Sequence, residues 1–232
     1  AKEAPKPVYY VPLTGEATDD QSALNRPVTA VMLENSPDAR PQSGLKDAEV
    51  VYEAIAEGGI TRFLALYQQH KPETVGPVRS VRLYYVDWLT PYDASVAHVG
   101  GSAKALQLVR GGGYRDIDQF FNGSYYRRAT DRAAPHNVYT SFSKLSELNA
   151  SKGYNTSDPK PLERTDDEKS PAQDATFVSM TISGPLYNPS YTYDPVTKLY
   201  GRSQAGSAHL DRESGQIQAK VVIALRVQMH KV

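Results

Sequence analysis

A charged, proline-containing stretch at residues 155–174 divides the chain into two parts of different character. It reads NTSDPKPLERTDDEKSPAQD and contains no aromatic residue. Such a segment cannot bury enough apolar surface to offset the conformational entropy that it loses on ordering, so we predict a linker between two domains. The total length of 232 residues also fits one or two domains.

The part before the linker alternates strand-like and helix-like patterns, which predicts an α+β domain over residues 13–154. Residues 50–56 and 60–68 are apolar and are separated by Glu57-Gly58-Gly59; since two glycines accept positive φ in a tight turn, we predict a β-hairpin. A helix over residues 47–55 is the main alternative, because its apolar residues also fit a helical period. Further strands are predicted at 28–33 and 94–99, a loop at 34–44, and helices at 80–89, directly after residue 102, and at 142–148 with Ser141 as N-cap.

Strands dominate the part after the linker. They are predicted at 176–183, 191–193, 199–202, 208–211 and 221–228, with turns between them. The predicted fold class is therefore an α+β domain with a mixed sheet and short helices, followed by a smaller β-rich domain over residues 175–232. We expect this second domain to be incomplete, since its pattern stops at Val232, and we expect residues 1–12 to form an extended tether.

Composition excludes several function classes. The 26 basic residues balance the 26 acidic ones, so the chain lacks the basic footprint of a nucleic-acid-binding protein. The absence of cysteine excludes disulfides, thiolate catalysis and iron–sulfur sites. No apolar run approaches the ~20 residues that span a bilayer, and no signal peptide is present at Ala1.

Ordered segments in both parts of the chain resemble one protein family. The first domain contains RPVTAVMLEN (26–35), ARPQSGLKDAEVVYEAIAEGGITRFLALY (39–67), GPVRSVRLYYVD (76–87), HVGGSAKAL (98–106) and APHNVYTS (134–141), and the tail contains YTYDPVTKLYGRSQAG (191–206). In order and spacing these resemble the YerB-like bacterial lipoproteins. The resemblance implies an extracytoplasmic protein anchored in the membrane through a lipid on an N-terminal cysteine, which this chain lacks. It implies no activity, ligand or catalytic residue.

Arginine is concentrated in the first domain. Between residues 40 and 132 there are nine arginines and only three lysines. Arginine is preferred over lysine where a carboxylate or phosphate is gripped by two parallel hydrogen bonds. We therefore expect Arg62, Arg79 and Arg82 to converge on an anion close to residues 100–102; if the predicted helix begins at Val78, Arg79 and Arg82 lie on neighbouring faces of its first turn. Pairing with carboxylates of the same domain is the alternative explanation.

Two glutamates flank the predicted hairpin turn. Glu53 and Glu57 are four residues apart and share a face, so they could form a carboxylate pair for acid–base chemistry. An ion pair from Glu57 to Arg62 or Arg79 that fixes the hairpin is the structural alternative.

A glycine-rich junction offers a second anion-binding element. Gly100, Gly101 and Ser102 lie between a predicted strand and helix, where free backbone N–H groups can hold an anion. The junction matches neither a P-loop nor a dinucleotide fingerprint, and Ser102 lacks the second glycine of a nucleophile elbow. The two S-x-x-K matches, at Ser43 and Ser141, lack the partner motifs of penicillin-type enzymes.

His136 is the best candidate for a general base. It lies in a proline-bounded loop, Ala134-Pro135-His136-Asn137, and the alternative is a structural histidine that holds this loop. No histidine pair has the spacing of a helical zinc site, so we expect no metal and no cofactor.

These residues are compatible with three different functions. The first is an extracytoplasmic lipoprotein-type binding protein with an arginine-rich cleft for an anionic small molecule or cell-envelope glycan. The second is a hydrolase or transferase acting on cell-envelope glycan or phosphodiester material, with Glu57 or His136 as base. The third is a structural protein that docks a partner through its β-rich tail, which predicts an exposed apolar patch there.

Overall fold

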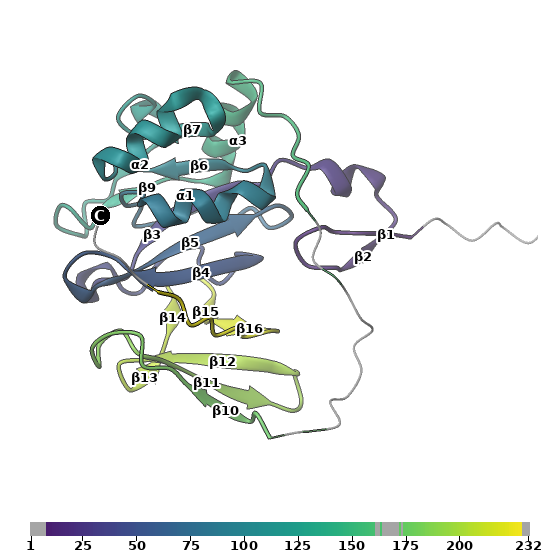
Figure 1. The fold of residues 1–232 in the computed structure, drawn as a ribbon, viewed down its shortest axis with the longest axis vertical. Helices are drawn as coiled ribbons and strands as arrows, with labels where there is room; N and C mark the ends of the chain where they lie inside the picture. Colours follow the sequence, from purple (N-terminus) through teal and green to yellow (C-terminus); the bar gives the residue numbers. More distant parts are fainter. Residues whose placement is uncertain (1–7, 161–162, 164–171, 173, 229–232) are drawn as a thin grey trace, which may run out of the picture.

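A five-stranded mixed sheet organises the first part of the chain. The computed structural model describes residues 8–160, 163, 172 and 174–228 (Figure 1). The strand order is β4-β5-β3-β6-β7; β3, β6 and β7 run parallel, and β5 is antiparallel to both of its neighbours. The strands are β3 (Thr29–Glu34), β4 (Val50–Ile55), β5 (Thr61–Tyr67), β6 (Ser95–His98) and β7 (Arg115–Asp118).

Helices bury both faces of this sheet. α1 (Leu83–Leu89) and α2 (Ala103–Leu108) cover one face, where Met32 and Leu64 pack beneath them. α3 (Phe142–Ser151) packs on the other face, against Val31 and Leu33. Because successive strand residues point to opposite faces and both faces are covered, β3 and β5 are largely apolar and are buried along their whole length.

Most predicted elements of this part are present. The hairpin is confirmed: β4 and β5 pair antiparallel, and Gly58 and Gly59 take φ of 63° and 77° in the turn between them. The alternative helix over 47–55 is wrong. Ser141 caps α3 as expected, its hydroxyl accepting a hydrogen bond from the Lys144 amide.

The helix predicted at 80–89 is too long at its start. α1 begins at Leu83, and Arg82 occupies the N-cap position with an extended backbone. The preceding residues are extended because they pair with segments that are distant in sequence. The Arg79 amide donates to the Met32 carbonyl, and Val81 forms a parallel β-bridge with Gly101. These long-range partners outweigh the local helical period of the segment.

The second part is β-rich, as predicted, and its main sheet is antiparallel. It comprises β10 (Phe177–Ser179), β11 (Pro189–Asp194), β12 (Leu199–Gln204), β13 (Ser207–Ala208) and β16 (Gln218–Ala219), with β14 (Leu210–Asp211) and β15 (Gly215–Gln216) forming a separate pair. The strand predicted at 221–228 is wrong: these residues form no strand, and Val221, Ile223, Leu225 and Val227 are exposed. The alternating pattern there has no neighbouring strand within the described residues with which to pair.

The predicted tether and linker are more ordered than expected where the structure describes them. Residues 1–7 and most of 161–173 lie outside the described residues. The remainder of the tether enters β1 (Tyr9–Tyr10), which pairs with β2 (Ala17–Thr18). Residues 155–160 are held on the first sheet domain, because the buried Ser157 hydroxyl accepts from the Val28 amide and donates to the Asp93 carbonyl.

The remaining elements are short. They are the strand pair β8 (Arg127–Arg128) and β9 (Val138–Tyr139), the 3-10 helices Gln21–Asn25, Pro37–Ala39, Glu57–Gly59, Thr90–Tyr92 and Gly123–Tyr125, and a π-helical turn at Val109–Gly113. No helix in the described part of the chain has the length and apolar character needed to cross a membrane.

A buried ion pair joins the two sheets. Arg202 on β12 donates to the Glu53 carboxylate on β4 at 2.9 Å, and the two side chains are only 5% and 10% exposed. The Arg202 guanidinium also lies over the Phe63 ring of the first sheet and bonds the Tyr191 hydroxyl of the second. Each part supplies one of the two charges, and either charge would be costly to bury without the other. The ion pair therefore joins the two parts of the chain.

His209 extends this contact. Its Nδ1 accepts a hydrogen bond from Arg202 Nε at 2.9 Å, and its Nε2 lies 2.8 Å from the Gln42 Oε1 in the first domain. Burial, and then the charges of Arg202 and Arg40, lower the pKa of His209 from 6.5 to about 3. The imidazole is therefore neutral at physiological pH and serves as a structural bridge.

Replacing Arg202 should cost the protein much of its stability. Arg202→Met leaves the Glu53 carboxylate buried without its cation, so we expect the free energy of unfolding to fall by about 3–5 kcal/mol in urea denaturation. The double variant Arg202→Met/Glu53→Gln removes that buried charge and should recover part of the loss. A loss below about 1 kcal/mol, or no recovery in the double variant, would show that the pair does not hold the interface.

Stability should also fall as the pH is lowered from 6.5 toward 3. Over this range the unfolded chain protonates His209 while the folded chain does not, so the free energy of unfolding drops by up to about 1.4 kcal/mol per pH unit from this residue. We expect His209→Gln, whose amide can accept and donate in the same way, to show a shallower slope between pH 4 and 6 in urea denaturation. Equal slopes in the two proteins would contradict this assignment.

Candidate functional site

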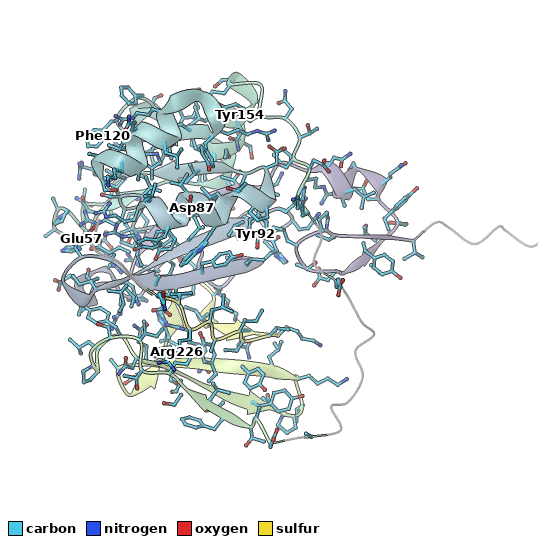
Figure 2. The ribbon with its side chains drawn as sticks, viewed as in Figure 1. Glu57, Asp87, Tyr92, Phe120, Tyr154 and Arg226 are labelled. Atoms are coloured by element: carbon cyan, nitrogen blue, oxygen red, sulfur yellow. The ribbon has the colours of Figure 1, made fainter. Side chains whose placement is uncertain are left out.

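Charged side chains gather where the parallel strands of the first sheet end. Glu34 is the last residue of β3, His98 of β6 and Asp118 of β7, so all three lie at the carboxyl edge of the sheet. The hairpin tip with Glu57 and the loop with Phe120 lie on the same side of the molecule, on the left of Figure 2. Ligands of open α/β sheets bind outside this edge.

Two of the three predicted arginines meet on one glutamate. Arg62 donates to Glu57 Oε2 at 3.0 Å, and Arg82 donates to Glu57 Oε1. Burial alone would raise the pKa of Glu57, but the hydrogen bond from Arg82 and the charge of Arg62 outweigh it and hold that pKa below its ordinary value. The ion-pair alternative for this hairpin is therefore correct for Glu57 and Arg62.

Arg79 lies beside this pair but engages a different carboxylate. Its Nε is 3.4 Å from Glu34 Oε2, an ion-pair contact in which neither atom completes a hydrogen bond. The pKa of Arg62 is lowered by burial and then by the neighbouring charges of Arg82 and Arg79, so the three guanidinium groups share one neighbourhood. The terminal nitrogens of Arg79 have no hydrogen-bond partner among the described residues, and a quarter of its side chain is exposed.

His136 reaches the same glutamate from the opposite direction. Its Nδ1 is 3.0 Å from Glu34 Oε2 and 3.2 Å from the Ser36 hydroxyl, which itself donates to Glu34 Oε1 at 3.0 Å. The imidazole is partly exposed, at 21%, while the Glu34 carboxylate is buried. The structural alternative for His136, a histidine bonded in place, is what these contacts describe.

The serine, histidine and glutamate of this group do not form a nucleophilic triad. In such a triad the nucleophile and the orienting carboxylate bond opposite ring nitrogens. Here Ser36 and Glu34 both face Nδ1, and the carboxylate near Nε2 is that of the exposed Asp38, 4.0 Å away.

Backbone amides of the glycine-rich junction already donate hydrogen bonds within the chain. The Gly100 amide donates to the buried Asp118 Oδ1 at 3.2 Å, and the Ser102 amide donates to the Val81 carbonyl. Gly100 has a φ of 61°, and a Cβ there would lie 2.9 Å from the Phe120 ring, so glycine is required. Because the amides of Gly100 and Ser102 are bonded internally, they are not free to hold an anion as the sequence predicted.

The other candidates have structural partners. Glu53 bonds Arg202 and Thr61, so it is not paired with Glu57 as an acid–base couple. The buried His98 lies 2.8 Å from the Gly100 carbonyl and 3.0 Å from Asp116. The described residues contain no cluster of histidine and acidic side chains that could hold a metal ion.

Two hollows of the described structure are lined by residues other than the three arginines. One, of about 120 Å³, is beside Thr29 and α3, and the other, of about 240 Å³, is beside Gly44 and Glu213. Neither of them is the cleft that was expected around Arg62, Arg79 and Arg82.

Sequence reasoning missed Glu34 and Ser36, which it placed in a loop of turn-forming residues. Neither has a motif, and their link to His136 spans about a hundred residues of chain. The available signal was positional: a charged residue at the end of a buried strand lies at the carboxyl edge of the sheet.

Comparisons with known proteins place the chain in a family. Residues 13–155 match the N-terminal domain and residues 178–232 the C-terminal domain of DUF3048, a protein family of unknown function. A Bacillus subtilis protein named "Putative lipoprotein YerB" is 39% identical over 209 residues, which are 88% of this chain. The chain spans 63% of the length of that relative.

A solved structure agrees with this assignment. The crystal structure of the YerB protein from Bacillus subtilis matches with a TM-score of 0.79 and 36% identity, covering 90% of this chain and 72% of that one. The chain therefore belongs to the DUF3048 family, the YerB-like proteins.

Proposed function

We propose that this protein is an extracytoplasmic lipoprotein-type binding protein, which holds the anionic group of a cell-envelope ligand at the carboxyl edge of its first sheet. The anionic group is a carboxylate or a phosphate, carried by a small molecule or by a glycan. Arg79 and His136 make the contacts, with Glu34 between them as the group that orients both. The extracytoplasmic location is supported by the name of the Bacillus relative.

The unused guanidinium fork of Arg79 carries this proposal. Within the described residues, seven of the nine arginines between residues 40 and 132 donate hydrogen bonds to protein groups: Arg40, Arg62, Arg82, Arg110, Arg115, Arg128 and Arg132. Arg127 lies over the Tyr139 ring. Arg79 alone in this set keeps its planar fork unengaged in a partly buried setting, which suits a bidentate carboxylate or phosphate.

The charges around Arg79 leave its fork free for an anion. Arg62, Arg79 and Arg82 bring three positive charges, Glu34 and Glu57 bring two negative ones, and the exposed Asp38 beside His136 brings a third. Because Glu57 is held by Arg62 and Arg82, an anion at the terminal nitrogens of Arg79 displaces no internal carboxylate.

The enzymatic alternative is less well supported by this geometry. Glu57 is held ionised by two arginines, and its lowered pKa makes it a weak base at neutral pH. His136 faces Glu34 with its Nδ1, and its Nε2 points away from that carboxylate. A hydrolase or transferase would therefore have this histidine as its one candidate for a general base. A substrate whose turnover is lost in His136→Ala would favour the enzyme.

A docking role for the tail has one observation in its favour. The apolar residues Val221, Ile223, Leu225 and Val227 are exposed in the tail, where this hypothesis expects an apolar surface. These exposures do not specify the chemistry of a partner, so the anion site is our principal proposal.

Inorganic phosphate at constant ionic strength tests the proposal. We expect phosphate to raise the melting temperature of the protein saturably, and this effect to weaken as sodium chloride is raised. Arg79→Lys keeps the charge but loses the planar fork, so it should melt within a few degrees of the parent and lose most of the phosphate effect. Differential scanning fluorimetry measures both quantities.

Arg115→Lys is the matched control. Arg115 has nearly the same side-chain exposure as Arg79, 27% against 25%, but it is bonded to Asp93, so this variant should keep the full phosphate effect. A phosphate effect that is absent from the parent, or that is equal in Arg79→Lys and the parent, would rule out this site. Strong destabilisation of Arg79→Lys without any phosphate effect in the parent would show that Arg79 is structural.

A further inference from the structure

We propose that the exposed rings of Phe120 and Phe121 are a stacking platform for a sugar ring, so that the ligand of the anion site is a sugar carrying a carboxylate or a phosphate. The two residues are 68% and 71% exposed, and they follow β7 at the carboxyl edge of the first sheet. Adjacent exposed apolar rings are the kind of surface that binding sites use. This inference rests on the proposed anion site and names the class of its ligand.

A hydrogen-bonded turn fixes the backbone beneath the two rings. The buried Asp118 carboxylate accepts a hydrogen bond from the Phe120 amide at 3.1 Å, and the Asp118 carbonyl accepts one from the Phe121 amide at 3.2 Å. The side-chain amide of Asn122 donates to the same carbonyl at 2.7 Å. The turn therefore holds both rings at the surface, and a platform that is already fixed loses little conformational freedom when a ligand covers it.

Each ring also has one neighbour that limits its orientation. The Phe120 ring rests on Gly100, where a Cβ would lie only 2.9 Å from it. The Arg110 guanidinium lies 4.8 Å from the centre of the Phe121 ring and is held there by a 2.7 Å hydrogen bond to Asp118. Most of the surface of both residues still faces solvent, which is what a stacking ligand requires.

The platform lies next to the segment that carries Arg79. Residues 79–81 run beside residues 99–101, because backbone hydrogen bonds of 3.0 and 3.1 Å and a parallel β-bridge join the two segments. One strand spacing of ~4.8 Å and the contact between Phe120 and Gly100 put the near edge of that ring within about 10 Å of the Arg79 backbone. One ligand with a ring and an anionic substituent can therefore contact both.

A sugar ring suits an exposed aromatic platform better than a nucleobase does. The faces of a pyranose carry C–H groups and its rim carries hydroxyls, so one face can stack while the hydroxyls remain in water. A nucleobase is recognised through hydrogen bonds to its edge, but the backbone amides of Phe120 and Phe121 are already bonded to Asp118. The rings therefore favour a sugar as the ligand class.

Isothermal titration calorimetry of the intact chain with matched probes tests this inference. Each pair of probes shares one anionic group and differs in the sugar ring: glucose 6-phosphate against glycerol 3-phosphate, and glucuronate against acetate. For at least one pair we expect the parent protein to bind the sugar about tenfold more tightly. Phe120→Ala and Phe121→Ala should each lose most of this preference and bind the smaller probe as the parent does, whereas Arg79→Lys should weaken both members of the pair.

Phe177→Ala is the matched control. Phe177 is 60% exposed on β10 of the second sheet, so its replacement should leave the affinities for both members of the pair unchanged. Because all three phenylalanines are exposed, the three alanine variants should melt within a few degrees of the parent.

The possible outcomes separate the two proposals. If no probe binds the parent protein, the anion site is wrong and this inference falls with it. If both members of each pair bind equally, or if the preference for the sugar survives in both Phe120→Ala and Phe121→Ala, the platform is wrong while the anion site stands. Uridine monophosphate that binds more tightly than glucose 6-phosphate, with the gain lost in those two variants, would assign the rings to a base instead of a sugar.

Discussion

The buried contact between Arg202 and Glu53 is the constraint on which the rest of the structure depends. A guanidinium taken out of water needs both a counter-charge and further hydrogen-bond acceptors, and here it finds them in two different sheets. The edge strand β4 would otherwise present its carboxylate and its unpaired backbone to solvent. The ion pair and hydrogen bonds of Arg202 therefore hold the second sheet to the first, together with the burial of apolar side chains.

This contact also sets the position of the candidate site. His209 and Arg202 bond Gln42 and Glu53, and Gln42 Nε2 in turn donates to the Glu34 carbonyl at 2.9 Å. The carboxylate that orients Arg79 and His136 therefore belongs to a residue whose backbone is fixed by the interface. A shift of the β-rich part would be transmitted to the candidate site through this chain of hydrogen bonds, and through Arg40, which bonds both Asn35 and the Leu186 carbonyl.

The sequence was sufficient where local pattern and tertiary partner agree. The β4–β5 hairpin follows from two apolar runs and two glycines, and α3 follows from its serine cap. It failed at residues 79–82, where Val81 fits a helical period with Tyr84, Tyr85 and Trp88, yet pairs in extended form with Gly101. It failed again at 221–228, because a strand needs a neighbour that local alternation cannot supply. The pairing of Glu34 with His136 has no local signature at all.

The excess of arginine over lysine in the first domain has two physical origins, which the structure separates. Most of these arginines use their fixed forks to bind backbone carbonyls and carboxylates of the same chain, as Arg132 does with Asp38 and Pro41. A lysine could not hold two such acceptors in one plane, so structure alone explains them. Arg79 is different, because its buried Nε has no hydrogen-bond partner and its fork is unused within the described residues. A side chain that loses conformational freedom without gaining hydrogen bonds is unfavourable for folding, which is the physical reason to look for its partner outside the chain.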